Sequence, residues 1–92
     1  MQTGVEDKKK EIIDFLKGKI AEITGHPEMK HEIKNDDPIK EMGIDSIKMV
    51  NLIVQIEQHF GIAFEDEELV IDFFSTVALF ASSILDKLGI DA

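Results

Sequence analysis

The sequence predicts an all-α fold of three longer helices and one short third helix, with a long loop between the first two. Apolar residues recur at helical spacing in three segments, and a glycine follows each of them. The chain has 92 residues, of which 43% are hydrophobic, so it can bury one modest core. We therefore expect a single domain over residues 1–92.

The first helix is predicted over residues 6–23. Its apolar positions lie at i, i+4, i+8 and i+11 and form one stripe, namely Ile12, Leu16, Ile20 and Ile23. Gly25 followed by Pro27 is typical of a helix end. This stripe is expected to face the core.

Residues 25–44 form a long polar connection. A structureless loop of about 20 residues is unusual in so small a domain and is commonly functional or pinned to the core. Ile33, Ile39 and Met42 are the apolar side chains within it. We expect these three residues to pin the loop.

The second helix is predicted over residues 46–60 and ends before Gly61. Its helical spacing is carried by Ile47, Val50, Ile53 or Val54, and Phe60. Leu52 and Ile56 make the segment apolar on more than one side, as expected of a central helix. Several of these residues are β-branched, so a buried strand is the competing interpretation. The length of the segment and its terminal glycine favour a helix.

Two shorter signals complete the fold. The acidic run at 65–68 precedes three apolar residues at 69–71, and its carboxylates suit the first turn of a short third helix. Ser75 or Thr76 then caps a last helix over residues 77–88, which stops at Gly89. Its stripe consists of Val77, Phe80 or Ala81, Ile84 and Leu88.

Composition excludes several classes of protein. The chain has no Cys, which rules out disulfides and thiolate chemistry of its own, and no apolar run long enough to span a membrane. Its polar N-terminus does not resemble a secretory signal, so we expect a soluble, cytoplasmic protein. The net charge is −9 and every basic residue is Lys, which disfavours binding to nucleic acid or to an anionic membrane. A basic protein partner suits this charge, although simple solubility explains it equally well.

The most informative segment is Gly43-Ile44-Asp45-Ser46-Ile47. A glycine turn and an acidic residue place Ser46 in the first turn of a helix, beside free N–H groups and the positive end of the helix dipole. Such a position suits a phosphate diester. The simpler alternative is that Ser46 or Asp45 only caps the helix.

Catalytic and metal sites are not expected. Ser46 does not lie in a G-x-S-x-G motif, and no calcium-binding loop is present. His26, His31 and His59 lack the spacing of metal ligands and are expected on the surface or in loops. A small hydrolase that uses Ser46 is only a distant alternative.

The segment Met42-Gly43-Ile44-Asp45-Ser46-Ile47 matches the motif (L/M)-G-x-D-S-(L/I). Together with the long loop, the helix that ends in Phe60-Gly61 and the segment 74–77, it makes the chain resemble the acyl and peptidyl carrier proteins. The resemblance extends over roughly residues 8–88.

This resemblance implies a four-helix bundle that is a carrier and not an enzyme. A phosphopantetheinyl transferase, with magnesium, would attach 4′-phosphopantetheine from coenzyme A to Ser46. The thiol of the arm would hold acyl or aminoacyl groups as thioesters, in fatty-acid, polyketide or peptide-type biosynthesis. The implied partners are the transferase and the acyl- or aminoacyl-loading and condensing enzymes, and the protein is expected to be a monomer. Asp45 would cap the helix or contact the transferase.

The second helix departs from the pattern of fatty-acid carriers, which have several acids on its exposed face. Here that face is predicted to hold Lys48, Asn51, Gln55, Gln58 and His59, with Glu57 as its main acid. The candidate partner contacts are Asp45, Ile47, Lys48, Met49 and Asn51. Met49 supplies either an apolar contact or core packing. The alternative function is an unmodified acidic helical bundle that acts as a protein-interaction module.

Overall fold

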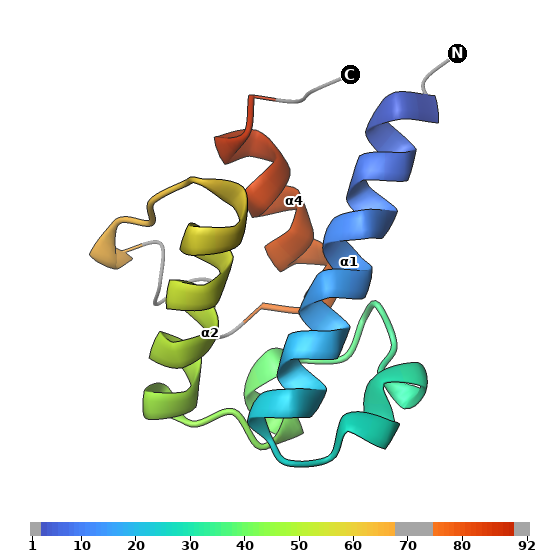
Figure 1. Cartoon of the computed structure of the whole chain (residues 1–92), viewed down its shortest axis with the longest axis vertical. Helices are drawn as coiled ribbons and strands as arrows, with labels where there is room; N and C mark the ends of the chain where they lie inside the picture. The colour runs from blue at the N-terminus through green and yellow to red at the C-terminus, as the bar shows by residue number, and fades with distance from the viewer. Residues whose placement is uncertain (1–2, 68–74, 90–92) are drawn as a thin grey trace.

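A computed structural model describes residues 3–67 and 75–89. The chain forms an α-helix α1 (Thr3–Ile23), two 3-10 helices η1 (Pro27–Glu32) and η2 (Ile39–Met42), and the α-helices α2 (Ser46–Phe60) and α4 (Val77–Lys87). Helix α1 packs against both α2 and α4 (Figure 1). Apart from an isolated bridge between Pro38 and Thr76, these residues contain no β-pairing. The all-α prediction is therefore confirmed.

The predicted helix bounds agree closely with the structure. Helix α2 spans the predicted residues, α4 ends one residue before the predicted end, and α1 begins three residues earlier than expected. Thr76 is the residue that caps α4, because its hydroxyl accepts a hydrogen bond from the Leu79 N–H over 3.2 Å. Of the predicted short third helix, Asp66 and Glu67 are helical, and residues 68–71 lie outside the described part of the chain.

The core lies between α1, α2 and α4. Its fully buried side chains come from all three helices and include Ile12, Leu16, Leu52, Ile56, Val77, Phe80 and Ile84. The predicted stripe of α1 is confirmed, with Ile23 half-buried at its end. None of the described helices is both long and apolar enough to cross a membrane.

Helix α2 is apolar on more than one side, as predicted, and it buries only one of these sides. Met49, Leu52, Ile53 and Ile56 are buried, while Ile47, Val50 and Val54 are 80%, 59% and 42% exposed. Of the residues whose spacing predicted the helix, Ile53 is therefore buried, whereas Ile47 and Val50 are exposed. The helix is apolar on two sides, and the side at i, i+3, i+4 and i+7 from Met49 is the fuller stripe.

The loop at 25–44 is pinned as predicted, and it is also tied by its backbone. Ile33 and Ile39 are buried and Met42 is half-buried against the core, joined by Ile44, which was not predicted. Three backbone hydrogen bonds tie the loop to the start of α4. They run from Ile39 N–H to Ser75 O (3.0 Å), from Val77 N–H to Asp37 O (3.2 Å) and from Ala78 N–H to Asn35 O (2.8 Å).

Candidate functional site

The candidate site lies where the loop enters α2. Gly43 has a φ of 82°, a left-handed conformation that glycine adopts without the strain of a side chain. The next residue, Ile44, is 1% exposed and anchors the turn in the core. Asp45 then extends the backbone as the N-cap, so that Ser46 becomes the first residue of the helix. These three residues therefore fix the direction in which the chain enters α2.

Asp45 closes the first turn of α2. Its Oδ1 accepts a hydrogen bond from the Lys48 N–H over 2.8 Å, and its carbonyl oxygen accepts one from the Met49 N–H over 2.8 Å. The Lys48 ammonium lies 3.7 Å from the other carboxylate oxygen. The backbone hydrogen bond from Lys48 lowers the pKa of Asp45 below its ordinary value, and the positive charge of Lys48 acts in the same direction. The predicted capping role of Asp45 is thus confirmed.

Ser46 is exposed at the first position of α2. The first N–H groups of a helix have no partner within it and carry a partial positive charge. The Lys48 N–H already donates a hydrogen bond to Asp45. The positive end of the helix dipole still favours a negative group on the Ser46 oxygen. This geometry suits an attached phosphodiester.

Beyond Ser46, α2 presents an exposed apolar stripe of Ile47, Val50 and Val54, here called the α2 stripe. The sequence predicted Ile47 as a partner contact, but it did not identify Val50 and Val54 as surface residues. Their spacing of i, i+3 and i+7 is the same signal that a buried stripe gives. Exposed apolar groups of this kind mark interaction surfaces when they are contiguous.

The other predicted contact residues occupy different environments. Lys48 is half-buried and Asn51 is exposed, with the Asn51 side-chain oxygen accepting a hydrogen bond from Gln55 over 2.9 Å. Met49 is only 4% exposed and belongs to the core cluster, which favours its packing alternative. Four of the five predicted contacts therefore lie at least partly on the surface.

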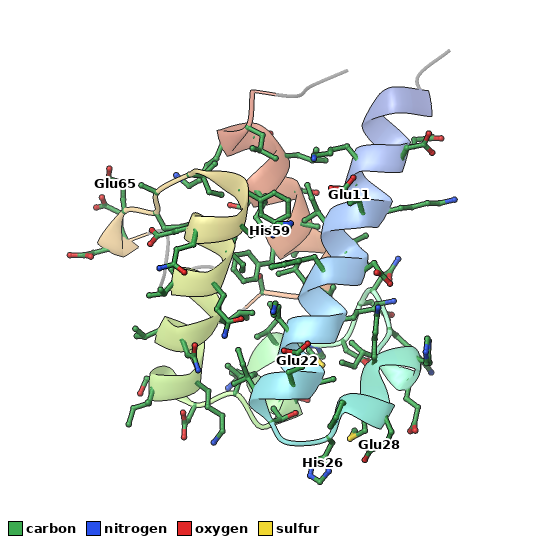
Figure 2. All side chains as sticks on the ribbon, viewed as in Figure 1. Glu11, Glu22, His26, Glu28, His59 and Glu65 are labelled. Atoms are coloured by element: carbon green, nitrogen blue, oxygen red, sulfur yellow. The ribbon has the colours of Figure 1, made fainter. Side chains whose placement is uncertain are left out.

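The far end of α2 is used for internal contacts. The Glu57 carboxylate accepts a hydrogen bond from the Phe64 N–H over 2.9 Å, which holds the segment after the helix. His59 lies between α2 and α1, where its ring stacks on that of Phe15 with centroids 4.2 Å apart (Figure 2). The main predicted acid of this face is thus engaged within the fold.

All three histidines are exposed, as predicted. In the part of the chain that the structure describes, no three His, Asp or Glu side chains gather in a way that could hold a metal ion.

The chain is similar to a known family of proteins and to three curated relatives. The family described as "Phosphopantetheine attachment site" matches residues 14–84, which include the whole of η1, η2 and α2. The acyl carrier protein homolog of Mycoplasma genitalium is 34% identical over 56 residues, covering 60% of this chain and 67% of that protein.

Two further relatives are similar over shorter segments. The homolog of Mycoplasma pneumoniae is 40% identical over 55 residues, covering 56% of this chain and 66% of that protein. The homolog of Mycoplasmopsis pulmonis is 42% identical over 41 residues, covering 45% of this chain and 56% of that protein. No solved structure matches the chain. The match over residues 14–84 covers well over half of the sequence, and the chain belongs to the phosphopantetheine-binding family of carrier proteins, which are not enzymes.

Proposed function

We propose that Ser46 is the residue that receives 4′-phosphopantetheine and that the protein carries acyl or aminoacyl groups on this arm. The observation that carries the proposal is the exposed serine at the first position of α2, directly after the Asp45 cap and inside the segment that the family matches. The bound arm supplies a terminal thiol, a group that the cysteine-free chain lacks.

The residues around Ser46 fit the negative charge of a phosphodiester. The start of α2 is the positive end of the helix dipole. The nearest carboxylate in sequence, Asp45, is already turned toward the Lys48 N–H and lies within 3.7 Å of the Lys48 ammonium. These contacts offset the repulsion that a neighbouring carboxylate would otherwise exert on the phosphate.

Intact mass after modification tests the site. The protein is incubated with coenzyme A, magnesium and a broad-specificity phosphopantetheinyl transferase. Wild type is expected to gain the mass of one phosphopantetheine group, and Ser46→Ala is expected to gain nothing. The matched control is Ser82→Ala, because Ser82 is a half-buried serine on α4. This variant should gain the same mass as wild type. Equal gain by Ser46→Ala would show that the site is elsewhere.

The α2 stripe and its polar neighbours are the proposed docking surface for partner enzymes. Ile47 is the most exposed large apolar side chain described, and it directly follows the attachment serine. Apolar contact from the stripe would be flanked by Asp45, Lys48 and Asn51, while Met49 would act only by packing beneath them. With a net charge of −9, the chain as a whole favours partners with a basic surface.

The proposed partners are the transferase and the acyl- or aminoacyl-loading and condensing enzymes of fatty-acid, polyketide or peptide-type biosynthesis. Val50→Gln should lower kcat/KM of the transferase for this protein, because it removes an apolar contact from the stripe. Leu79→Gln is the control, since Leu79 is 61% exposed and lies on a different helix, α4. Equal kcat/KM for the two variants would count against docking through α2.

An unmodified interaction module is the second candidate function. The exposed α2 stripe favours it as well, because a stripe of this kind can bind a partner with or without an arm on Ser46. The two functions differ in the mass experiment. A module would gain no mass with the transferase and would still lose partner binding on Val50→Gln.

A further inference from the structure

A shallow groove of about 280 Å³ lies between α1 and α2. Its lining residues are Phe15 and Lys19 of α1 and Gln55, Gln58 and His59 of α2. The rings of Phe15 and His59 stack with centroids 4.2 Å apart, and Figure 2 shows His59 between the two helices. None of these five residues is acidic, although the chain has 19 acids among its 92 residues. The groove therefore differs in charge from the protein as a whole.

The exposed surface of α2 beside the groove also lacks acids. Its side chains lie at i, i+3, i+7 and i+10 and form one row, here called the polar stripe, namely Lys48, Asn51, Gln55 and Gln58. The first three each directly follow a residue of the α2 stripe, so the two stripes run side by side. Glu57 is the one acid in α2, and its carboxylate accepts a hydrogen bond from the Phe64 N–H over 2.9 Å. A partner that covers the α2 stripe therefore meets amide and ammonium groups on the side of the groove.

Lys19 supplies the positive charge of the groove. Its ammonium lies 5.5 Å from the centre of the Phe15 ring and 3.6 Å from a carboxylate oxygen of Glu22. Glu22 is exposed, and an exposed ion pair within one helix contributes little. Because an ammonium has three N–H donors, a second carboxylate can bind beside Glu22 or replace it.

The amide groups of the groove complete a set of donors for a carboxylate. The Gln55 amide has two N–H groups, and one of them donates to the Asn51 side-chain oxygen over 2.9 Å. The exposed Gln58 amide is a further donor, and the His59 imidazole is neutral or positive but never negative. A carboxylate has two acceptor oxygens, which suit these amides and the Lys19 ammonium.

We infer that this groove receives an Asp or Glu side chain of the partner enzyme, while the α2 stripe receives an apolar segment next to it. The inference rests on the proposed docking through α2 and specifies what the partner presents there. The acid that lies closest to the α2 stripe in sequence, Asp45, has a carboxylate oxygen 3.7 Å from the Lys48 ammonium, which offsets its repulsion of an incoming acid.

The net charge of the chain does not oppose this contact. Exposed charges more than about 8 Å apart are largely screened at physiological ionic strength. The net charge of −9 therefore acts mainly on the approach of a partner, whereas the groups in the groove act on the contact itself.

Three helical peptides that differ only in charge test the inference on the unmodified protein. Each has leucines along one face, and the edges of that face are all Glu, all Gln or all Lys. NMR titrations follow the backbone amide signals of Lys19, Gln55 and Gln58. The Glu peptide is expected to shift these signals with a Kd about two- to fivefold lower than that of the Gln peptide, the range for one exposed ion pair. Non-specific repulsion from a chain of net charge −9 predicts the opposite order.

Two lysine variants of equal net charge show whether the groove causes the preference. Lys19→Gln removes the ammonium of the groove and should lose the preference for the Glu peptide over the Gln peptide. Lys17→Gln removes the same charge two residues earlier on α1, at a residue that does not line the groove, and should keep the wild-type preference. A preference that survives in Lys19→Gln would overturn the inference.

Other occupants of the surface give different results. Tighter binding of the Lys peptide at the same signals would assign the groove to a basic partner, and shifts caused by raising the protein concentration alone would assign it to a second copy. Either result, or no preference for Glu over Gln in wild type, overturns the inference.

The peptides need no arm on Ser46, so the mass measurement tests the proposed carrier function separately. A chain that takes up the arm without preferring the Glu peptide overturns only the inference about the groove. A chain that prefers the Glu peptide and takes up no arm overturns only the carrier function.

Discussion

Asp45 has two effects at the scale of a single residue, since it starts α2 and places a negative charge beside Ser46, the proposed attachment residue. The carboxylate is fixed by the Lys48 N–H, which donates a hydrogen bond to Oδ1 over 2.8 Å. Asn and Ser can also cap a helix. What Asp adds is a charge that the helix dipole stabilises.

The charge of Asp45 makes one contribution to stability that depends on pH. Its pKa in the folded state is below the ordinary 3.8, because the Lys48 N–H stabilises the ionised form. The ionised cap therefore stabilises the fold above pH 3.8, and this contribution is lost as the pH falls through the lower folded-state value. Asp45→Asn keeps a capping oxygen and removes the charge. We expect wild type to unfold at a higher temperature than Asp45→Asn at pH 7, with the gap narrowing below pH 3.8.

Thermal unfolding followed by circular dichroism across this pH range measures the gap. Asp45→Ala is the control, because it removes both the cap and the charge and should unfold below Asp45→Asn at every pH. A gap between wild type and Asp45→Asn that stays constant from neutral to acid pH would show that the charge contributes nothing.

At the scale of elements, the sequence predicts the helices better than it predicts their faces. The bounds of α2 follow from the Asp45 cap and from Gly61, which are local signals. Its buried face is not a local property, because Val50 and Leu52 lie on opposite sides and both are apolar. Which side is buried depends on the packing of α1 and α4, which no stripe within α2 specifies. The same ambiguity concealed two residues of the proposed docking surface.

Gly61 shows how a helix end depends on backbone conformation. It has a φ of 69°, and its N–H donates to the Glu57 carbonyl oxygen over 2.9 Å. A Cβ at this position would meet no atom within 4 Å, so the effect of a side chain is on the backbone alone. Gly61→Ala should lower the free energy of unfolding by about 1–2 kcal/mol, because other L-residues are strained in the left-handed region.

The matched control is Gly18→Ala in the middle of α1, where φ is not positive and a Cβ would make ordinary contact with the Lys30 side chain at 3.7 Å. This change should raise the free energy of unfolding by about 0.5–1 kcal/mol, since Ala favours a helix interior over Gly. Urea denaturation measures both values. If the two substitutions had effects of the same sign, the conformational argument for Gly61 would fail.

At the scale of the whole molecule, the radius of gyration is 12.4 Å, close to the value of about 12 Å expected for a compact chain of this length. The loop at 25–44 contributes to this compactness through its hydrogen bonds to the start of α4.

The burial of Ile33 and Ile39 could be predicted from the sequence, because isolated apolar residues in a polar loop usually pack against the core. The bond from Ala78 N–H to Asn35 O could not, because it joins distant backbone groups that carry no mark in the sequence.

The loss of a single core side chain from α2 is expected to lower the stability of the whole domain. Leu52 is fully buried in the core cluster, so Leu52→Ala should lower the free energy of unfolding by about 2–5 kcal/mol. In a domain of this size, that loss is a large part of a total stability of about 5–15 kcal/mol. Leu79→Ala removes the same atoms from a side chain that is 61% exposed, and should change stability by at most about 0.5 kcal/mol.

Urea denaturation followed by circular dichroism compares the two variants. Similar losses of stability for both would contradict the burial of α2 on its Leu52 side. Because the α2 stripe lies on the opposite side, the agreement of this experiment with the Val50→Gln measurement would assign one face of α2 to the core and the other to partners.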